Sequence, residues 1–118
     1  MLNMDFTKSV VLNTNDMDWQ GSPAEGVQRK PLAREEAERG HATSVVRYAK
    51  GASFDQHFHP KGEEILVLSG SLSDERGRYT AGTWIRNPEI SWQHWSGTAG
   101  TVVLYKTGHF KSSDGVNE

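Results

Sequence analysis

Cysteine is absent from the 118-residue chain, which excludes disulfide bonds and zinc sites built from thiolates. No apolar run approaches the length that spans a bilayer, and the segment after Met1 is polar, unlike a signal peptide. The 13 basic and 15 acidic residues are interspersed without a basic stripe, which argues against nucleic-acid binding. These absences predict a cytoplasmic protein that binds neither membranes nor nucleic acid.

Helical periodicity is nearly absent from the sequence. The one stretch of helix-forming composition, residues 32–39, is short and densely charged, and it fits a turn or an exposed loop as well as a helix. Elsewhere, short runs of β-forming residues alternate with clusters of Gly, Asn, Asp, Ser and Pro, which is typical of a sandwich or barrel. The sequence therefore predicts an all-β chain, with strands near Ser9–Leu12, Thr43–Ala49, Gln56–His59, Glu63–Ser69, Ser71–Asp74, Thr83–Arg86, Trp92–Trp95 and Thr101–Thr107.

The length of the chain fits a single domain with a modest core. We expect a barrel over about residues 40–110, with residues 1–30 wrapped around its edge. The polar residues from about Lys111 onward are expected to be frayed.

The predicted strand over residues 63–69 is apolar on both faces. Ile65 and Val67 share one face, whereas Leu66 and Leu68 share the other. A half-exposed antiparallel strand would instead alternate apolar with polar residues. Either a second layer or the N-terminal segment covers the back of this strand, or a second subunit does, and the latter alternative predicts a homodimer.

The residues with the strongest chemical signal form a short cluster. His57 and His59 lie two residues apart, and on a strand that spacing points both imidazoles to the same face. The turn-forming residues 60–62 then lead to Glu63, and a fourth candidate, His94, has to be brought back by the fold. Imidazoles combined with one carboxylate suit a borderline divalent ion such as iron, zinc, nickel or manganese. The cluster therefore predicts one metal ion per chain.

Other polar residues compete with this cluster. Glu64 neighbours Glu63, but on a strand the two point to opposite faces, so only one can join the histidines, and the spacing favours Glu63. His41 and His109 match no motif, and we expect both at the surface.

The spacing of these residues resembles the motifs of the cupins. The first cupin motif is matched by Gly51, His57, His59, Glu63 and Gly70, and the beginning of the second by Gly82 and Pro88. Within the superfamily, the chain is similar to the ChrR-like cupins in Gly62-Glu63-Glu64, in the run Ile-Leu-Val-Leu-Ser-Gly and in the phrase Tyr79-Thr-Ala-Gly-Thr-Trp-Ile-Arg-Asn-Pro88. The resemblance covers about residues 10–107.

The resemblance implies a double-stranded β-helix, a jelly-roll barrel with the metal inside one end. It also implies the ligands His57, His59, Glu63 and His94. The last residue stands one position later than the family pattern, which places Gln93 at the ligand position. An extra residue in the turn over 89–92 would point His94 inward, whereas the unshifted register would point Gln93 inward.

The aromatic residues near this site allow two interpretations. The four tryptophans fit core and rim packing, because aromatic side chains supply much of the buried area in small folds. They also fit the wall of a substrate pocket at the barrel mouth. In that case the wall would be formed by Trp84, Trp92 and Trp95.

Two functions follow from the resemblance. ChrR-like anti-sigma proteins carry an N-terminal helical zinc domain with cysteine, and we expect no such domain here. Stand-alone relatives include dioxygenases that cleave diketones and acetophenones. We therefore expect a non-haem, metal-dependent dioxygenase that acts on a small carbonyl or aromatic compound, with Fe(II) or Zn ahead of Ni or Mn as the metal. The alternative is a non-catalytic zinc-binding sensor or regulatory cupin, since fold does not fix function.

Overall fold

The computed structural model describes residues 1–35, 41–57, 62–88 and 92–108, without the side chains at 54–57, 92–95, 98 and 99. No helix in these ranges is long and apolar enough to cross a membrane. A short 3-10 helix covers Thr14–Asp16. The strands are β1 (Gln20–Gly21), β2 (Val27–Arg34), β3 (Ala42–Tyr48), β4 (Ser53–His57), β5 (Glu63–Asp74), β6 (Gly77–Thr80), β7 (Trp84–Asn87) and β8 (Trp92–Thr107).

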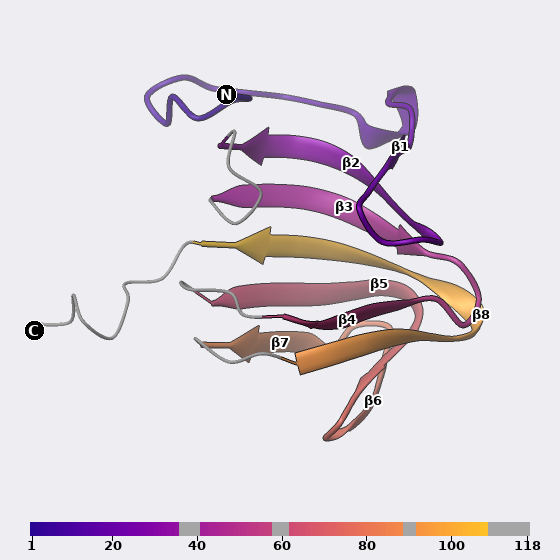
Figure 1. Cartoon of the computed structure of the whole chain (residues 1–118). Helices are drawn as coiled ribbons and strands as arrows, with labels where there is room; N and C mark the ends of the chain where they lie inside the picture. The colour runs from indigo at the N-terminus through magenta and orange to yellow at the C-terminus, as the bar shows by residue number, and fades with distance from the viewer. Residues whose placement is uncertain (36–40, 58–61, 89–91, 109–118) are drawn as a thin grey trace, which may run out of the picture.

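The strands form two layers that share the long strands β5 and β8. In the first layer, β1, β2 and β3 continue into the second half of β8, then the first half of β5, and then β7. In the second layer, the first half of β8 pairs with β4 and with the second half of β5, which also pairs with β6. Figure 1 shows both long strands turning between the layers on the right-hand side.

The turn between the layers depends on two glycines that lie against each other. Gly70 in β5 has a φ of 74° and Gly100 in β8 a φ of 83°, values that favour glycine. A Cβ atom on Gly70 would lie 2.0 Å from the carbonyl oxygen of Gly100, which leaves no room for a side chain. The sequence predicted two strands on either side of Gly70, and the structure joins them into one bent strand.

The apolar core draws side chains from both layers. Its buried members are Val27, Val46, Tyr48, Ile65, Val67, Leu72, Ile85 and Val103. Along β5 the core residues alternate with outward ones, so that Ile65 and Val67 are buried whereas Leu68 is exposed. This alternation fixes which residues of β5 face the interior.

The all-β prediction is confirmed, but the strand predicted over Ser9–Leu12 is wrong. These residues lie outside the strands, and Val10, Val11 and Leu12 are exposed. Strand-forming residues are stabilised mainly by packing on a sheet surface, and exposed side chains gain little from such packing.

The strands β1, β2 and β6 were not predicted from the sequence. β2 contains basic residues and a proline, and neither signals a strand. Its basic side chains nevertheless pack, because Lys30 Nζ lies 4.5 Å from the ring centre of Trp19, over which Arg47 from β3 also lies. Pro31 adjoins a shift in the β2–β3 register, a place where a strand tolerates proline.

Candidate metal centre

Two connections between the layers bring four strand ends to one end of the barrel. β4 ends at His57 and β5 begins at Glu63, while β7 ends at Asn87 and β8 begins at Trp92. Within the first layer Glu63 is the cross-strand partner of Asn87, and within the second His57 is the partner of Trp92. Figure 1 shows these strand ends on its left-hand side. Positions from both predicted motifs therefore meet at this end.

The side chain of Glu63 faces the interior. Glu63 is 1% exposed and alternates with the outward-facing Glu64 in the same pattern that buries Ile65 and Val67. Its cross-strand partners are Asn87 on one side and Thr107 on the other, and both are buried. The carboxylate of Glu63 therefore lies on the face of the sheet that packs against the core.

The protonation of Glu63 reflects this environment. Burial raises the pKa of Glu63 to about 7, because the charged form loses its hydration. A hydrogen bond from Tyr105 and the positive charge of Arg76 lower the pKa, and the negative charge of Asp74 raises it further. Removal of water is thus the dominant effect, and a cation placed beside the carboxylate would offset it.

Two tyrosines share this interior. Burial raises the pKa of the Tyr105 hydroxyl well above its usual range, and the neighbouring negative charge of Glu63 adds to the effect. Burial and Glu63 likewise raise the pKa of Tyr48. Both phenols remain protonated at neutral pH and can act as hydrogen-bond donors. No motif in the sequence relates either tyrosine to Glu63.

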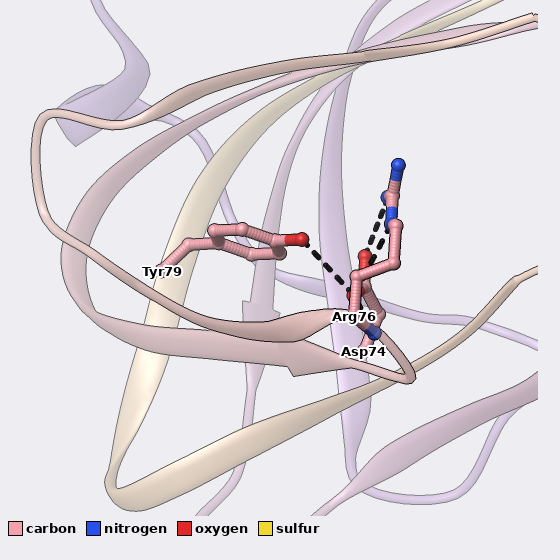
Figure 2. Close-up of polar contacts among 3 residues, drawn as sticks. All are labelled: Asp74, Arg76 and Tyr79. Carbon is pink, nitrogen blue, oxygen red and sulfur yellow. Dashed lines mark hydrogen bonds and ion pairs between the residues drawn. The ribbon is translucent and has the colours of Figure 1, made fainter.

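A second buried carboxylate lies at the end of β5 and is held by a compact ion pair (Figure 2). Arg76 Nη2 lies 2.6 Å from Asp74 Oδ2, and the Tyr79 hydroxyl donates a hydrogen bond of 3.1 Å to Asp74 Oδ1. Burial alone would raise the pKa of Asp74, but the hydrogen bonds from Arg76 and Tyr79 outweigh it and lower the pKa. Asp74 is therefore a charged, satisfied group, and no motif in the sequence indicated this cluster.

Asn87 is a further polar residue that the sequence analysis did not identify. It is 0% exposed and occupies the inward face of β7 together with Ile85. Neither its amide nitrogen nor its amide oxygen has a hydrogen-bond partner within the described part of the chain. A buried carboxamide without partners is rare in native proteins.

The predicted ligands fall partly outside the described residues. Glu63 is the member of the set whose side chain is described, and it is buried at the expected end of the barrel. His57 and His94 are placed as backbone positions in β4 and β8, and their side chains lie outside the described part, as does the whole of His59. The metal-ligand set therefore stays a prediction.

The predicted aromatic wall has one described side chain. Trp84 is 55% exposed on the outer face of β7, where Arg86 lies 4.9 Å from its ring centre, and it alternates with the buried Ile85. Its outward position does not contribute to an interior wall. The side chains of Trp92 and Trp95 lie outside the described residues.

The described donors fit a divalent metal. Glu63 supplies a carboxylate that burial has stripped of water, and Asn87 adds a carboxamide without partners on the neighbouring strand. The ladder of β4 and β8 brings the backbone of two histidine positions to the same end of the barrel. Carboxylate oxygen and imidazole nitrogen together are the ligand chemistry of borderline divalent metals.

A two-layered barrel that encloses a carboxylate at one end is the architecture of a cupin. The sequence matches the ChrR Cupin-like domain family over residues 7–111, and the chain therefore belongs to that family. This confirms the resemblance seen in the motifs. No curated protein matches the sequence.

Solved structures with low sequence identity share the fold. One is the complex of Rhodobacter sphaeroides SigE with the anti-sigma ChrR, with 22% identity and a TM-score of 0.66 over 80% of this chain and 50% of the matched chain. Another is an acetylacetone dioxygenase from Acinetobacter johnsonii, with 14% identity and a TM-score of 0.67 over 92% and 80%. A third is KdgF from Halomonas sp., with 20% identity and a TM-score of 0.63 over 92% and 100%. The chain spans half the length of its match in the SigE complex.

Proposed function

We propose that this cupin is a metal-dependent enzyme of the non-haem dioxygenase type that acts on a small carbonyl or aromatic compound. The observation that carries the proposal is the buried carboxylate of Glu63, which occupies the ligand position of the first cupin motif and faces the interior. The similarity in fold to an acetylacetone dioxygenase supports the same reaction class. When bound, a divalent metal supplies Lewis acidity, and iron(II) adds redox chemistry with dioxygen.

The residues of the chain supply binding and orientation around that metal. Glu63, as a carboxylate, binds the cation, and the Tyr105 hydroxyl holds the carboxylate by a hydrogen bond. The core side chains Ile65, Val67 and Val103 exclude water from the interior beneath it. A dry interior strengthens the attraction between Glu63 and a cation, because the low dielectric screens it less.

The register of β4 and β8 supports His94 over Gln93 as the fourth ligand. His57 is the cross-strand partner of Trp92, and His94, the partner of Phe54, lies two positions from Trp92, so the two-residue period of a strand gives His94 and Trp92 the same face. Gln93 occupies the alternate position. The β4–β8 ladder also has a register shift between Phe54 and His57, which adds a residue in β4. We propose His57, His59, Glu63 and His94 as the ligands of one metal ion per chain.

Metal analysis followed by an oxygen-uptake assay tests the function. Protein purified without added metal is analysed for iron, zinc, nickel and manganese, then stripped and reloaded with Fe(II) or Zn(II). The expected result is one metal per chain and oxygen consumption with Fe(II) and acetylacetone or a related diketone. The matched control is Glu64→Gln, which alters the neighbouring carboxylate on the outer face and leaves binding and turnover intact.

A zinc-binding regulatory cupin is the second candidate, and its support is the shared fold with the SigE–ChrR complex. In this function the metal stabilises one conformation of the barrel and no substrate is consumed. One zinc per chain, a rise in thermal stability on zinc binding and no oxygen uptake with any metal would favour it over the enzyme. Metal content far below one per chain after reloading would contradict both candidates.

We also propose that the protein forms a homodimer through the apolar part of the outer face of β5, around Leu66 and Leu68. Leu68 is 48% exposed on this face, and Leu66 is the cross-strand partner of the exposed Trp84. Apolar side chains grouped on an outer sheet face are typical of an interface. Light scattering at micromolar concentration is expected to give the mass of two chains, and Leu68→Glu to give the mass of one.

A further inference from the structure

The strongest unexplained feature of the described residues is the carboxamide of Asn87. It is fully buried, and neither of its polar atoms has a hydrogen-bond partner among the described residues. Burying a polar group without a partner costs free energy, because its hydrogen bonds to water are lost and not replaced. A leucine has nearly the same size and would avoid this cost. The position therefore keeps a polar group for a reason other than the packing of the core.

The location of Asn87 indicates the role of its carboxamide. It is the last residue of β7, at the end of the barrel that carries the proposed metal ligands. It is also the direct cross-strand partner of Glu63, and both residues are buried on the inward face. Directly opposed residues on one face have Cβ atoms about 5 Å apart, so an amide and a carboxylate at these positions can form a hydrogen bond by side-chain rotation alone.

A ligating carboxylate uses part of its capacity for the metal and retains lone pairs for a second donor. Groups that hydrogen-bond such ligands fix their orientation and strengthen metal binding. The carboxamide of Asn87 has two N–H donors and stands beside the one carboxylate of the proposed site.

We propose that Asn87 is a positioning residue of the metal centre: its amide N–H donates a hydrogen bond to the carboxylate of Glu63 when that carboxylate binds a divalent metal. The inference rests on the proposed metal site, and it holds for either the enzyme or the zinc-binding function. Without metal the amide stays buried and unsatisfied within the described residues, and with metal it gains a partner. Asn87 thus lowers the stability of the metal-free barrel and raises the affinity of the barrel for the metal.

The variant Asn87→Leu separates the two effects. It removes the carboxamide and keeps the branched shape and the number of heavy atoms, so the metal-free variant is expected to melt at the same temperature as the parent protein or higher. Its affinity for Zn(II), measured by competition with a chromogenic chelator, is expected to fall by about tenfold, the usual effect of losing a group that orients a ligand. The control is Ile85→Val, which changes packing on the same inward face of β7 and is expected to leave zinc affinity unchanged.

The outcomes distinguish this inference from the metal site itself. Absence of zinc binding by the parent protein would overturn both. Zinc binding by the parent with the same affinity in Asn87→Leu would overturn the inference alone, as would an equal loss of affinity in Ile85→Val. If Asn87→Leu does not fold, the pair Asn87→Ser and Asn87→Ala replaces it. These two differ by one hydroxyl, and the inference requires tighter zinc binding by the serine variant.

Discussion

Glu63 and Glu64 are adjacent in sequence and occupy opposite faces of the same strand, with different consequences. Glu63 is buried, lies opposite Asn87, and has a pKa raised to about 7 by loss of hydration. Glu64 lies opposite Arg86, whose Nη2 and Nε donate hydrogen bonds of 2.7 and 2.9 Å to one carboxylate oxygen. Glu64 is paired with an arginine, whereas Glu63 lies beside a neutral amide and accepts a hydrogen bond from Tyr105.

The cross-strand neighbour explains the difference between the two carboxylates. An arginine neutralises a surface carboxylate and satisfies its hydrogen bonds, so a metal cation gains little by binding there. The cross-strand partner of Glu63 is a neutral asparagine, and the hydrogen bond from Tyr105 and the charge of Arg76 offset only part of the cost of burying this carboxylate. The inward member of the pair is therefore suited to bind a metal, and the outward member is suited to hold the sheet together.

The largest expected effect is on metal binding when each carboxylate is removed in turn. Glu63→Gln deletes the charge that faces a dication in a dry interior, and losing one partner of a buried charge pair costs about 2 to 5 kcal/mol. We expect zinc affinity to fall by about a thousandfold in this variant and to stay unchanged in Glu64→Gln. Competition with a chelator of known affinity measures both.

A similar loss of zinc affinity in the two variants would contradict the contrast between Glu63 and Glu64, since it would mean that both faces of β5 contribute to the site. Near-normal binding in Glu63→Gln would place the metal elsewhere.

A smaller effect is expected from the residues of β8. His94 lies two positions from Trp92, the cross-strand partner of His57, whereas Gln93 lies between these two residues. His94→Ala removes a neutral ligand, and we expect zinc affinity to fall by about a hundredfold, the upper end of the loss seen for residues that support a metal site. Gln93→Ala is expected to bind zinc normally. Loss of affinity in the glutamine variant alone would show that the strand keeps the register of the family pattern.

The stability of the metal-free protein should depend on the pH through Glu63. Its pKa is about 7 in the folded chain and about 4.5 in the unfolded chain, so the folded state binds more protons between these values. Stability is therefore highest at or below about pH 4.5 with respect to this group, and it falls as the pH rises toward 7. The loss is on the order of 3 kcal/mol, because one pKa unit corresponds to about 1.4 kcal/mol.

Urea unfolding of metal-free protein between pH 5 and pH 8 measures this dependence. Glu63→Gln is expected to remove it, and Glu64→Gln to retain it. Zinc should reverse the trend in the parent protein, since metal binding requires the deprotonated carboxylate. A parent protein whose metal-free stability rises with pH over this range would contradict the assignment of the raised pKa to Glu63.

The predictable part of this molecule was the part encoded by local patterns. The runs of strand-forming residues in Thr43–Ala49 and Glu63–Ser69 predicted β3 and the first half of β5, and motif spacing predicted Glu63 as a ligand at one end of the barrel. β2 was missed because part of its packing comes from the long side chain of Lys30, which lies on Trp19 beside Arg47 of β3, and hydropathy does not register such contacts.

The polar interior was unpredictable for a different reason. Asp74, Arg76 and Tyr79 come together through a turn at the end of β5, and Asn87 meets Glu63 only through the register of two strands. Cross-strand pairing is a property of the folded sheet, and no local pattern in a single sequence specifies it. The sequence could therefore indicate a ligand but not the residues that surround it.

The smallest expected effect concerns the ion pair on the outer face. Arg86 is 57% exposed in its side chain, and pairs between exposed charges contribute less than about 1 kcal/mol because water and salt screen them. A double-mutant cycle with Glu64→Gln and Arg86→Met, read by urea unfolding, is expected to give a coupling energy below about 1 kcal/mol that shrinks further in high salt. Methionine keeps an unbranched side chain over Trp84, so the cycle reports the charges rather than the packing. A coupling energy of about 3 kcal/mol that resists salt would mean that the proposed dimer interface around Leu68 also covers this pair and removes it from solvent.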